Sequence, residues 1–502
     1  MIIVLETNLP SFSNDIADVV RMMMPGAIVR ESDDANADKR ISHTHTEHEG
    51  YWHEQCTIAG NSTDYNTFDW QVPIPQPGAQ SPEAFTLNTK RLLKRAAKQC
   101  CYYLLKNITH HHPPWGALTG IRPTRLFAER LAAGDPDPER TIMQSFDTRQ
   151  DKAALLRSIC ETQSPYLSVD PCEVDIYVGI PYCVTRCAYC SFKTEIIPKD
   201  PRKTDAYVSA LVTEIQSTRE LMDECGLQPH ALYMGGGTPT ALEASRLDNI
   251  ITALDRAFPN VLEFTVEAGR PDTLDGERLK VLRSHPVTRI SINPQTMNDS
   301  TLERIGRRHT AAQTIDAFDR ARTMGFNNIN MDLIAALPGE SVGDFARTLE
   351  AVQTLQPDSL TIHTLARKRA SKLFDDPAFI ETAPETVEEM ILLGAESARQ
   401  MGMRPYYLYR QKQIAGNQEN VGYAKPDRIS IYNIDMMEET ASILALGAGG
   451  ISKRVMYNDA NQLRIERAPN MMESARYIER LDEMIERKRA LWSEPNGNNK
   501  GV

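Results

Sequence analysis

The segment Ile180–Phe192 reads IPYCVTRCAYCSF and carries three closely spaced cysteines, Cys183, Cys187 and Cys190. Gaps of three and two residues allow three thiolates to ligate three irons of a cubane iron–sulfur cluster. The fourth iron is then open to an exchangeable ligand. The spacing therefore predicts an iron–sulfur centre with one free coordination position.

Structural zinc is the main alternative, because cysteines two residues apart are common zinc ligands. A closed zinc site requires four ligands, usually as two pairs. The nearest further cysteines are Cys172 and Cys225, and neither belongs to a second pair. A disulfide is less favoured. Nine cysteines in 502 residues is a modest number, and the first residues, MIIVLETNLPSF, lack the apolar core of a signal peptide. We therefore expect reduced thiols and a cytoplasmic location.

The amino-acid composition restricts the classes of protein to which this chain can belong. A chain of 502 residues with 41% hydrophobic residues should form two or three domains with a substantial core. The 56 basic and 67 acidic residues give a net charge of -11, which argues against nucleic acid as a partner. The mean hydropathy is -0.41 and no run of about twenty apolar residues occurs, so no membrane span is expected.

Strand-like apolar segments alternate with helical patterns in the middle of the chain. The six strand-like segments are DIYVGIP, ALYMGGGT, EFTVEAG, RISINPQ, INMDLIAALPG and SLTIHTLA. A repeated strand–helix–strand pattern predicts right-handed parallel crossovers. We therefore expect an α/β fold with a complete or partial barrel, whose chemistry lies at the carboxyl ends of the strands.

The flanking regions differ from this barrel and suggest three parts. Residues 1–165 predict a small N-terminal α+β module with a linker, residues 166–382 the barrel, and residues 383–502 a mostly helical C-terminal cover over the barrel mouth. Four N-terminal histidines could be imagined as a metal site, but the alternating HTHTEH pattern favours a solvated strand face. They are His43, His45, His48 and His53.

Polar residues and glycines follow the predicted strands. They are the run GGGTPT at Gly235–Thr240, Glu267, Gln295, Arg307 and Asp332. Glycines let the backbone approach a ligand closely. Taken one at a time, each of these polar side chains could equally make a structural hydrogen bond or contact a ligand. Because they recur at successive strand ends beside the cysteine loop, a ligand site at the barrel mouth is favoured.

These motifs together resemble a known family. IPYCVTRCAYCSF, YMGGGTPT, TVEAGRPD, ISINPQTM, IGRRH and MDLIAALPG are similar to radical S-adenosylmethionine (SAM) enzymes of the oxygen-independent coproporphyrinogen III oxidase family. PWGALTGIRPTR and PYYLYRQKQIAGNQENVGYA resemble more narrowly its HemZ type, called coproporphyrinogen dehydrogenase. The resemblance is strongest from Val174 to Lys453 and weak before Lys90, and it implies a partial (β/α)6 radical SAM barrel.

The resemblance also implies the cofactors and the site. Cys183, Cys187 and Cys190 would ligate a 4Fe-4S cluster whose open iron chelates SAM, and no catalytic residue is assigned beyond the cluster and this cofactor. The implied SAM-binding positions are Tyr177, Tyr189, Gly236, Gly237, Thr238, Glu267, Gln295, Arg307, Asp332, Ala366 and Ile451.

The reaction that the resemblance implies starts from a 5′-deoxyadenosyl radical. The radical removes a hydrogen from the β-carbon of a propionate, and loss of carbon dioxide and one electron leaves a vinyl group. Two such steps convert coproporphyrinogen III into protoporphyrinogen IX in haem biosynthesis, with an electron donor such as flavodoxin or ferredoxin. Four substrate carboxylates call for basic residues at the mouth. The candidates are Arg307, Arg308, His309, Arg367, Lys368, Arg369, Lys372, Arg410 and Lys412.

Two rival functions remain open. The best-known family members carry a further cysteine where this chain has Phe192, and haem chaperones that resemble the family share this shorter motif. The N-terminal module and the sequence Asn293-Pro294-Gln295 favour the enzyme over the chaperone. A radical SAM methyltransferase that opens haem is the third possibility.

Overall fold

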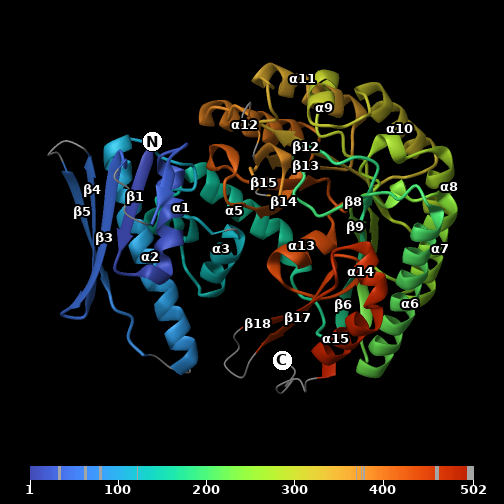
Figure 1. Cartoon of the computed structure of the whole chain (residues 1–502), viewed down its shortest axis with the longest axis horizontal. Helices are drawn as coiled ribbons and strands as arrows, with labels where there is room; N and C mark the ends of the chain where they lie inside the picture. The colour runs from blue at the N-terminus through green and yellow to red at the C-terminus, as the bar shows by residue number, and fades with distance from the viewer. Residues whose placement is uncertain are drawn as a thin grey trace. The chain divides into compact units, whose positions relative to one another are not determined.

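The computed structural model describes most of the chain. The described residues are 1–31, 36–60, 65–77, 82–120, 122–368, 370–374, 376, 379–457 and 463–493. They group into two compact units. The first contains residues 1–123 and 129–155, and the second contains residues 124–128 and those from 156 onward that the structure describes (Figure 1).

The first unit is an α+β module built on a sheet with the strand order β2-β1-β3-β4-β5. The strands are β1 (Ile2–Thr7), β2 (Ile28–Arg30), β3 (Lys39–His48), β4 (Tyr51–Gly60) and β5 (Tyr65–Pro73). Helices α1 (Ser13–Met23) and α2 (Pro82–Thr109) pack on it through a core that includes Ile3, Val20 and Cys101. Of the shorter helices that follow, α4 (Pro138–Phe146) belongs to this unit, whereas α3 (Pro123–Ala132) and α5 (Gln150–Gln163) each have residues in both units.

The part of β3 that carries His43 and His45 is not the solvated face that its alternation predicts, whereas His48 is exposed as expected. His43 is buried, and its ring lies between Thr7 Oγ1 and Glu54 Oε2, each at 2.9 Å. Glu54 is also buried, and its other carboxylate oxygen lies 2.8 Å from His45 Nδ1. The prediction failed because helix α2 packs on this face of the sheet. The periodicity of a single strand cannot reveal such a helix.

The second unit confirms the predicted α/β barrel. Its sheet has the order β14-β15-β13-β12-β11-β10-β9-β6-β16-β17-β18 among the described residues. The six predicted strands are its parallel centre: β6 (Glu173–Ile180), β9 (Gln228–Gly236), β10 (Glu263–Val266), β11 (Arg289–Ser291), β12 (Ile329–Ala335) and β13 (Ser359–Thr364). Because β6 and β9 pair Gly179 with Gly235, their carboxyl ends lie together.

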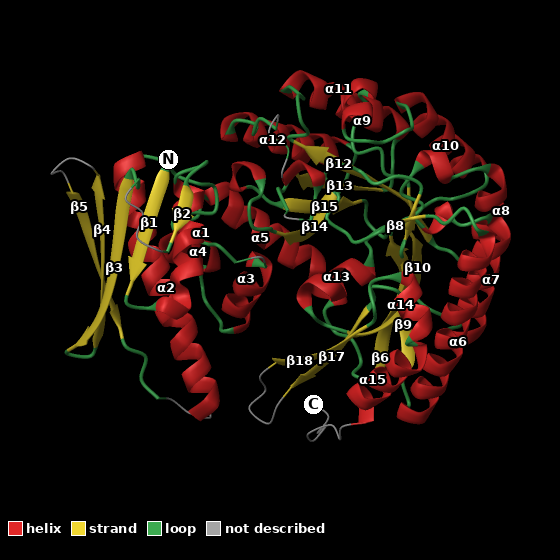
Figure 2. Cartoon of the chain, in the orientation of Figure 1, coloured by secondary structure: helices red, strands yellow, loops and turns green. Residues whose placement is uncertain are grey.

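Helices join these strands and line the outside of the sheet (Figure 2). They are α6 (Pro201–Cys225), α7 (Ala244–Ala257), α8 (Gly276–Ser284), α9 (Asp299–Arg304), α10 (Ala311–Thr323), α11 (Val342–Leu355) and α12 (Pro384–Gln400). Local sequence signals set their ends. Asp200 caps α6 with Pro201 in the first turn, and Gly226 ends that helix at a positive φ of 68°.

The C-terminal residues contain the expected helices and also strands that extend the sheet on both sides. The strands are β14 (Arg404–Tyr409), β15 (Asn420–Ala424), β16 (Ser442–Gly447), β17 (Ile451–Tyr457) and β18 (Leu463–Pro469). The helices are α13 (Ile431–Glu438), α14 (Ser474–Glu479) and α15 (Leu481–Ser493). Because β15 pairs with β13 and β16 with β6, the expected boundary between residues 382 and 383 falls inside the second unit.

Candidate functional site

The cysteine loop lies at the carboxyl end of β6. After Ile180 the chain forms β7 (Tyr182–Cys183), which pairs with β8 (Glu195–Ile196) on the far side of the loop. The amide of Ala188 donates to the carbonyl of Ile305 at 2.9 Å, and the Ala188 carbonyl accepts from the amide of Leu373 at 3.2 Å. Segments that follow β11 and β13 therefore hold the loop in place.

The thiols of the cysteine loop are not drawn together as ligands of a single zinc ion. Thiolates on one tetrahedral zinc ion lie about 3.8 Å apart, given Zn–S bonds of about 2.3 Å. In the part of the chain that the structure describes, the three loop sulfurs are not gathered within 4.8 Å of one another. Cys172 precedes β6 and Cys225 ends α6, so both exposed thiols lie at the opposite end of the barrel strands. Neither can supply a fourth zinc ligand.

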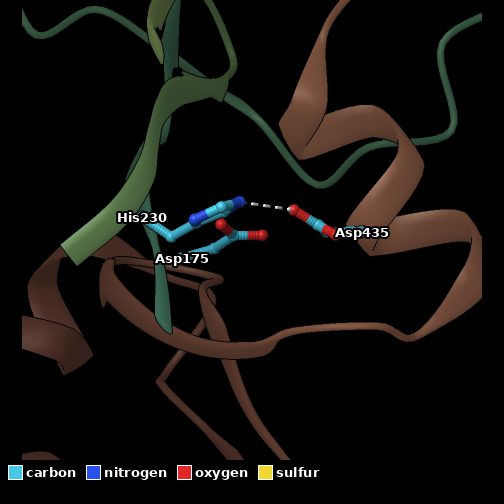
Figure 3. A group of neighbouring side chains, drawn as sticks. All are labelled: Asp175, His230 and Asp435. Carbon is cyan, nitrogen blue, oxygen red and sulfur yellow. Dashed lines mark ion pairs between the residues drawn. The ribbon is translucent and has the colours of Figure 1, made fainter. Parts of the chain in front are cut away.

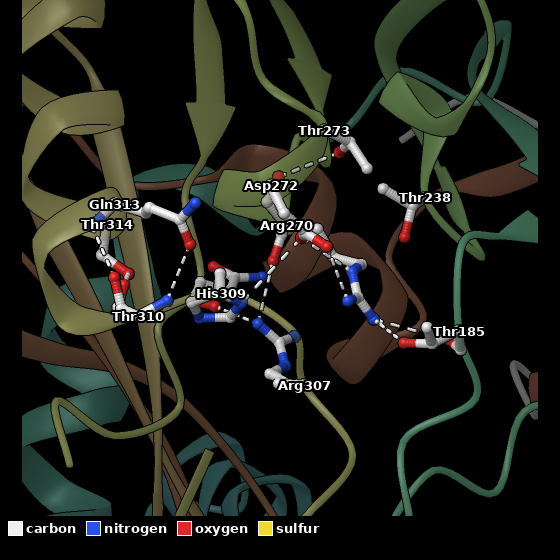
Figure 4. A network of polar contacts seen from close by, with 12 residues as sticks. Thr185, Thr238, Arg270, Asp272, Thr273, Arg307, His309, Thr310, Gln313 and Thr314 are labelled. Atoms are coloured by element: carbon white, nitrogen blue, oxygen red, sulfur yellow. Dashed lines mark hydrogen bonds and ion pairs between the residues drawn. The ribbon is translucent and has the colours of Figure 1, made fainter. Parts of the chain in front are cut away.

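Two features of the surroundings affect the charge of the thiols. Burial raises the pKa of Cys183 and of Cys190. In addition, the guanidinium of Arg270 lies 3.7 Å from Cys187 Sγ and places a positive charge beside that sulfur. Arg270 also donates to Thr185 Oγ1 at 2.8 Å and is held by Asp272, as Figure 4 shows. Arg270 was not predicted from the sequence, although it lies shortly after the third barrel strand, in the motif EAGRPD.

The glycine run after β9 packs directly against the cysteine loop. The amide of Gly237 donates to the carbonyl of Ile180 at 2.6 Å, and that of Thr238 donates to the carbonyl of Tyr182 at 2.8 Å. A Cβ at Gly237 would lie 2.5 Å from the Tyr182 carbonyl oxygen. Gly236 has a φ of 102°, which an L-residue adopts only with strain. These glycines are required for the close approach of the two segments.

Glu267 and Tyr177 lie among stacked tyrosines inside the barrel. The Tyr233 hydroxyl donates to a carboxylate oxygen of Glu267. Burial raises the pKa of Glu267 to about 7, and the nearby Asp332 adds to the rise. The ring of Tyr177 stacks on that of Tyr233, with centroids 6.4 Å apart. Glu267 is therefore a carboxyl group that can change protonation near neutral pH.

Gln295 and Asp332 come from neighbouring strands and lie beside each other. The amide of Gln295 donates to the carbonyl of Asp332 at 2.9 Å, and Gln295 adopts a φ of 68°. Burial alone would raise the pKa of Asp332, but hydrogen bonds from His363, Asn330 and Thr361 outweigh it and hold that pKa below its usual value. Asp332 therefore stays ionised beside Glu267.

Arg307 connects the cysteine loop to the end of the fourth barrel strand. Its Nη1 donates to the carbonyl of Asn293 at 2.5 Å, and its Nε donates to the Tyr189 hydroxyl at 3.3 Å. The side chain is buried, and Tyr189 and Cys187 nevertheless raise its pKa. A permanent positive charge thus lies next to the thiols.

The remaining predicted positions lie further along the sheet. Ala366 follows β13 and bridges to Ile414. Ile451 begins β17, and 48% of its surface is exposed. The preceding strand β16 ends beside β6, where Gly447 pairs with Gly179. The side chain of Ile451 thus has more solvent around it than the other predicted positions.

A cavity of about 1020 Å³ opens next to the cysteine loop. Its lining is rich in charge: it includes Thr185, Arg186, Asp299, Glu303, Arg307, Arg308, His309 and Lys372. Arg186 is a cavity residue that sequence reasoning missed. Two other predicted basic residues bind the chain itself, because Arg367 donates to the carbonyl of Phe374 and Arg410 donates to Asn417. Arg369 lies outside the described residues.

Comparison with known proteins agrees with this architecture. The family model of the radical SAM superfamily matches residues 177–352. The oxygen-independent coproporphyrinogen-III oxidase-like protein HemZ of Bacillus subtilis is 36% identical over 87% of this chain and 87% of its own length. The haem chaperone HemW of the same organism is 34% identical over 38% of this chain and 49% of its own.

A solved structure shows the same fold. The coproporphyrinogen III oxidase HemN of Escherichia coli, a radical SAM enzyme, aligns over 66% of this chain and 73% of its own with a TM-score of 0.50 and 22% identity. In the described part of our chain, no helix is long and apolar enough to cross a bilayer.

Proposed function

The chain belongs to the radical SAM family of oxygen-independent coproporphyrinogen-III oxidase-like proteins, and we propose that it oxidatively decarboxylates coproporphyrinogen III. Its cofactors are those of the superfamily, a 4Fe-4S cluster and SAM. The reaction would turn two propionates into vinyl groups and give protoporphyrinogen IX. Each conversion releases one carbon dioxide and removes two electrons and a proton from the substrate, in steps that begin with transfer of a hydrogen atom.

Cys183, Cys187 and Cys190 would hold the cluster. When bound, the reduced cluster supplies an electron that cleaves SAM to methionine and a 5′-deoxyadenosyl radical. Arg270 and Arg307 stabilise the negatively charged thiolates from the protein side. The buried position of Cys187, of which 9% is exposed, limits access of water and oxygen to this part of the loop.

The other predicted residues would bind and orient SAM. The ionised Asp332 and the carboxyl of Glu267 suit the ammonium and ribose hydroxyls of SAM, since these are hydrogen-bond donors. Arg307 suits its carboxylate. Tyr177, Tyr189, Gln295, Ala366 and the Gly236–Thr238 segment would complete the site, with Ile451 at its edge.

The cavity beside the cysteine loop carries the proposal for the substrate. Arg186, Arg308 and Lys372 are exposed side chains on its wall, where they could pair with propionate carboxylates. Arg186 Nη2 also donates to the carbonyl of Ala370 at 2.8 Å, so its pairing with substrate would use its remaining donors. Thr185 and Arg186 lie between Cys183 and Cys187, so a bound tetrapyrrole would lie directly beside the radical source. A small flavodoxin- or ferredoxin-type donor in a reducing cytoplasm would suit the oxygen-sensitive cluster.

A haem chaperone is the second candidate. The similarity to HemW supports it, but that similarity covers 38% of the chain against 87% for HemZ. Phe192, 66% exposed, stands where the best-known oxidases carry a further cysteine, and this also favours the chaperone.

One anaerobic experiment separates the two. The full chain is reconstituted with iron and sulfide, reduced, and incubated with SAM and coproporphyrinogen III. We expect about four irons per chain, 5′-deoxyadenosine, and a substrate mass lower by the loss of two carbon dioxide molecules and four hydrogens. The Cys187→Ser variant should lose these products, and Cys172→Ser should retain them. Full cluster loading without a vinyl product, together with tight haem binding, would refute the oxidase proposal.

A further inference from the structure

A second group of metal-ligand residues lies at the other end of the barrel from the cysteine loop. Asp175 in β6, His230 in β9 and Asp435 in α13 bring three ligand atoms within 4.8 Å of one another. Figure 3 shows the three side chains pointing toward one another. Asp175 and Asp435 are fully buried and His230 is 7% exposed. These residues lie near the amino-terminal ends of β6 and β9, so they are separate from the proposed SAM site.

The hydrogen bonding of this group is incomplete. Among the described residues, neither carboxylate oxygen of Asp175 makes a hydrogen bond of standard geometry, although the backbone amide of Ala231 is close enough to lower the pKa of this carboxyl. Asp435 Oδ2 and His230 Nδ1 also have no hydrogen-bond partner among these residues. His230 Nε2 lies 3.6 Å from Asp435 Oδ2, which is too long for a hydrogen bond. A buried carboxylate without a partner is costly, so this group requires a cation or a proton.

We propose that Asp175, His230 and Asp435 bind a divalent transition-metal ion. Metal–nitrogen and metal–oxygen bonds of about 2.1 Å place two ligands about 3.4 Å apart on a tetrahedral ion, close to the separation of the His230 and Asp435 atoms. One imidazole and two carboxylates suit Zn²⁺ or Mn²⁺. Bound water would complete the coordination.

Residues around the group resemble the supporting partners of metal ligands. His230 Nδ1 faces the carboxylate of Glu173 at 3.4 Å, and a carboxylate that faces the second nitrogen of a ligating histidine orients its ring. The free Asp435 oxygen Oδ1 accepts a hydrogen bond from the Thr440 hydroxyl. Both partners leave His230 Nε2 and Asp435 Oδ2 available to one ion.

The competing explanation is neutralisation without a metal. Burial and the nearby Asp435 raise the pKa of Asp175, and burial raises that of Asp435 to about 6. Glu263 adds negative charge, whereas the Lys453 ammonium lowers the pKa of both aspartates. Protons together with Lys453 could therefore balance the charge, and the experiment must distinguish this from a metal.

A metal here would fasten α13 to the floor of the barrel. Tyr432, one turn before Asp435 in α13, stacks on Tyr233 with ring centroids 4.5 Å apart. Tyr233 in turn donates to Glu267. The ion would thus hold in place the helix that contributes Tyr432 to the tyrosine stack. This proposal does not depend on whether the chain is a coproporphyrinogen oxidase.

Mn²⁺ is a suitable probe, because it prefers oxygen and nitrogen ligands and avoids the thiolates of the cysteine loop. The full chain with its cluster assembled is equilibrated with Mn²⁺ at pH 7.5, and free Mn²⁺ is measured from its electron paramagnetic resonance signal. We expect one tightly bound Mn²⁺ per chain. Binding should weaken at least tenfold in Asp175→Asn and in His230→Gln. It should not change in Asp248→Asn, which alters a surface aspartate that pairs with His285 at 2.8 Å.

Thermal unfolding is a second measurement, which also tests the proposal if a variant folds poorly. Mn²⁺ should raise the melting temperature of the wild-type chain but not that of Asp175→Asn. Lys453→Met removes the competing cation, so it should bind Mn²⁺ at least as tightly as the wild type. Absence of a stoichiometric site in the wild type, or equal binding by wild type and Asp175→Asn, would overturn the proposal.

Discussion

Arg270 Nη1 lies 3.7 Å from Cys187 Sγ, and the arginine side chain is only 3% exposed. Asp272 holds the guanidinium through two hydrogen bonds, of 3.1 Å to Nε and 2.9 Å to Nη2. A buried positive charge at this distance favours the more negative, reduced state of a cluster bound to the thiolate. Arg270 is therefore a positioning and electrostatic residue of the cysteine loop.

Replacing Arg270 by Gln should lower the reduction potential of the cluster. A lost interaction of about 1.4 kcal/mol corresponds to about 59 mV for one electron, and we expect a shift of this order. Arg270→Lys, which keeps the charge, should shift less. A redox titration followed by electron paramagnetic resonance measures this. Arg202→Gln is the control, since its side chain is 88% exposed. Equal potentials in Arg270→Gln and Arg202→Gln would contradict the assignment.

SAM affinity should fall as the pH drops below about 7, if Glu267 binds SAM as a carboxylate. Burial raises the pKa of this group to about 7, so its ionised fraction falls about fivefold between pH 7 and pH 6. Glu267→Gln should bind SAM more weakly at pH 8 and remove this pH dependence. Equilibrium binding to the reconstituted protein checks it, with the exposed Glu277→Gln as control. A pH profile that persists in Glu267→Gln would assign the titration to another group.

The same raised pKa affects folding in the opposite direction. The folded state keeps a proton on Glu267 between about pH 4.5 and pH 7 that the unfolded state releases, so this group stabilises the fold at low pH and loses that effect as pH rises through about 7. In the protein without SAM, Glu267→Gln should therefore gain stability relative to wild type as the pH rises from 5 to 8. Urea unfolding at several pH values measures this. A constant difference between the two proteins would be inconsistent with the raised pKa.

A methyl group at Gly237 should push β9 and the cysteine loop apart. The added Cβ would lie 2.5 Å from the Tyr182 carbonyl oxygen, and overpacking of this kind costs about 1–3 kcal/mol. We expect Gly237→Ala to melt at a lower temperature and to bind less iron after reconstitution. Gly276→Ala is the matched control, because only the end of the Met324 side chain comes within 4 Å. Full iron binding by Gly237→Ala would show that the loop does not depend on this contact.

Lys488 should matter far more for stability than the neighbouring Arg489. Its ammonium donates to the buried carboxylate of Glu214 at 2.9 Å and joins α15 to α6. Lys488→Met leaves Glu214 without its positive partner, which costs about 3–5 kcal/mol for a buried pair. Arg489→Met removes an exposed pair with Glu224 and should cost less than about 1 kcal/mol. Denaturant unfolding compares them, and similar losses would disprove the difference.

Much of the barrel could be predicted because its signals are local. Each of the six central strands is a short apolar run between helical patterns, and each of them forms. The C-terminal strands β15 and β16 were harder to predict from the sequence. NVGYA and SILALG are short, and they become β15 and β16 because β13 and β6 offer them edges to pair with. Pairing of this kind depends on chain segments far away in the sequence, so no local pattern reports it.

By itself, the sequence determined the three-cysteine loop and the parallel order of the barrel strands, since covalent spacing and hydrophobic periodicity act over a few residues. Only the tertiary structure decided which charges surround the thiols, why Gly237 must lack a side chain, and that Asp175, His230 and Asp435 meet. These contacts join residues from distant segments. Their positions follow from the packing of whole strands and helices, which burial of apolar surface sets for the fold as a unit.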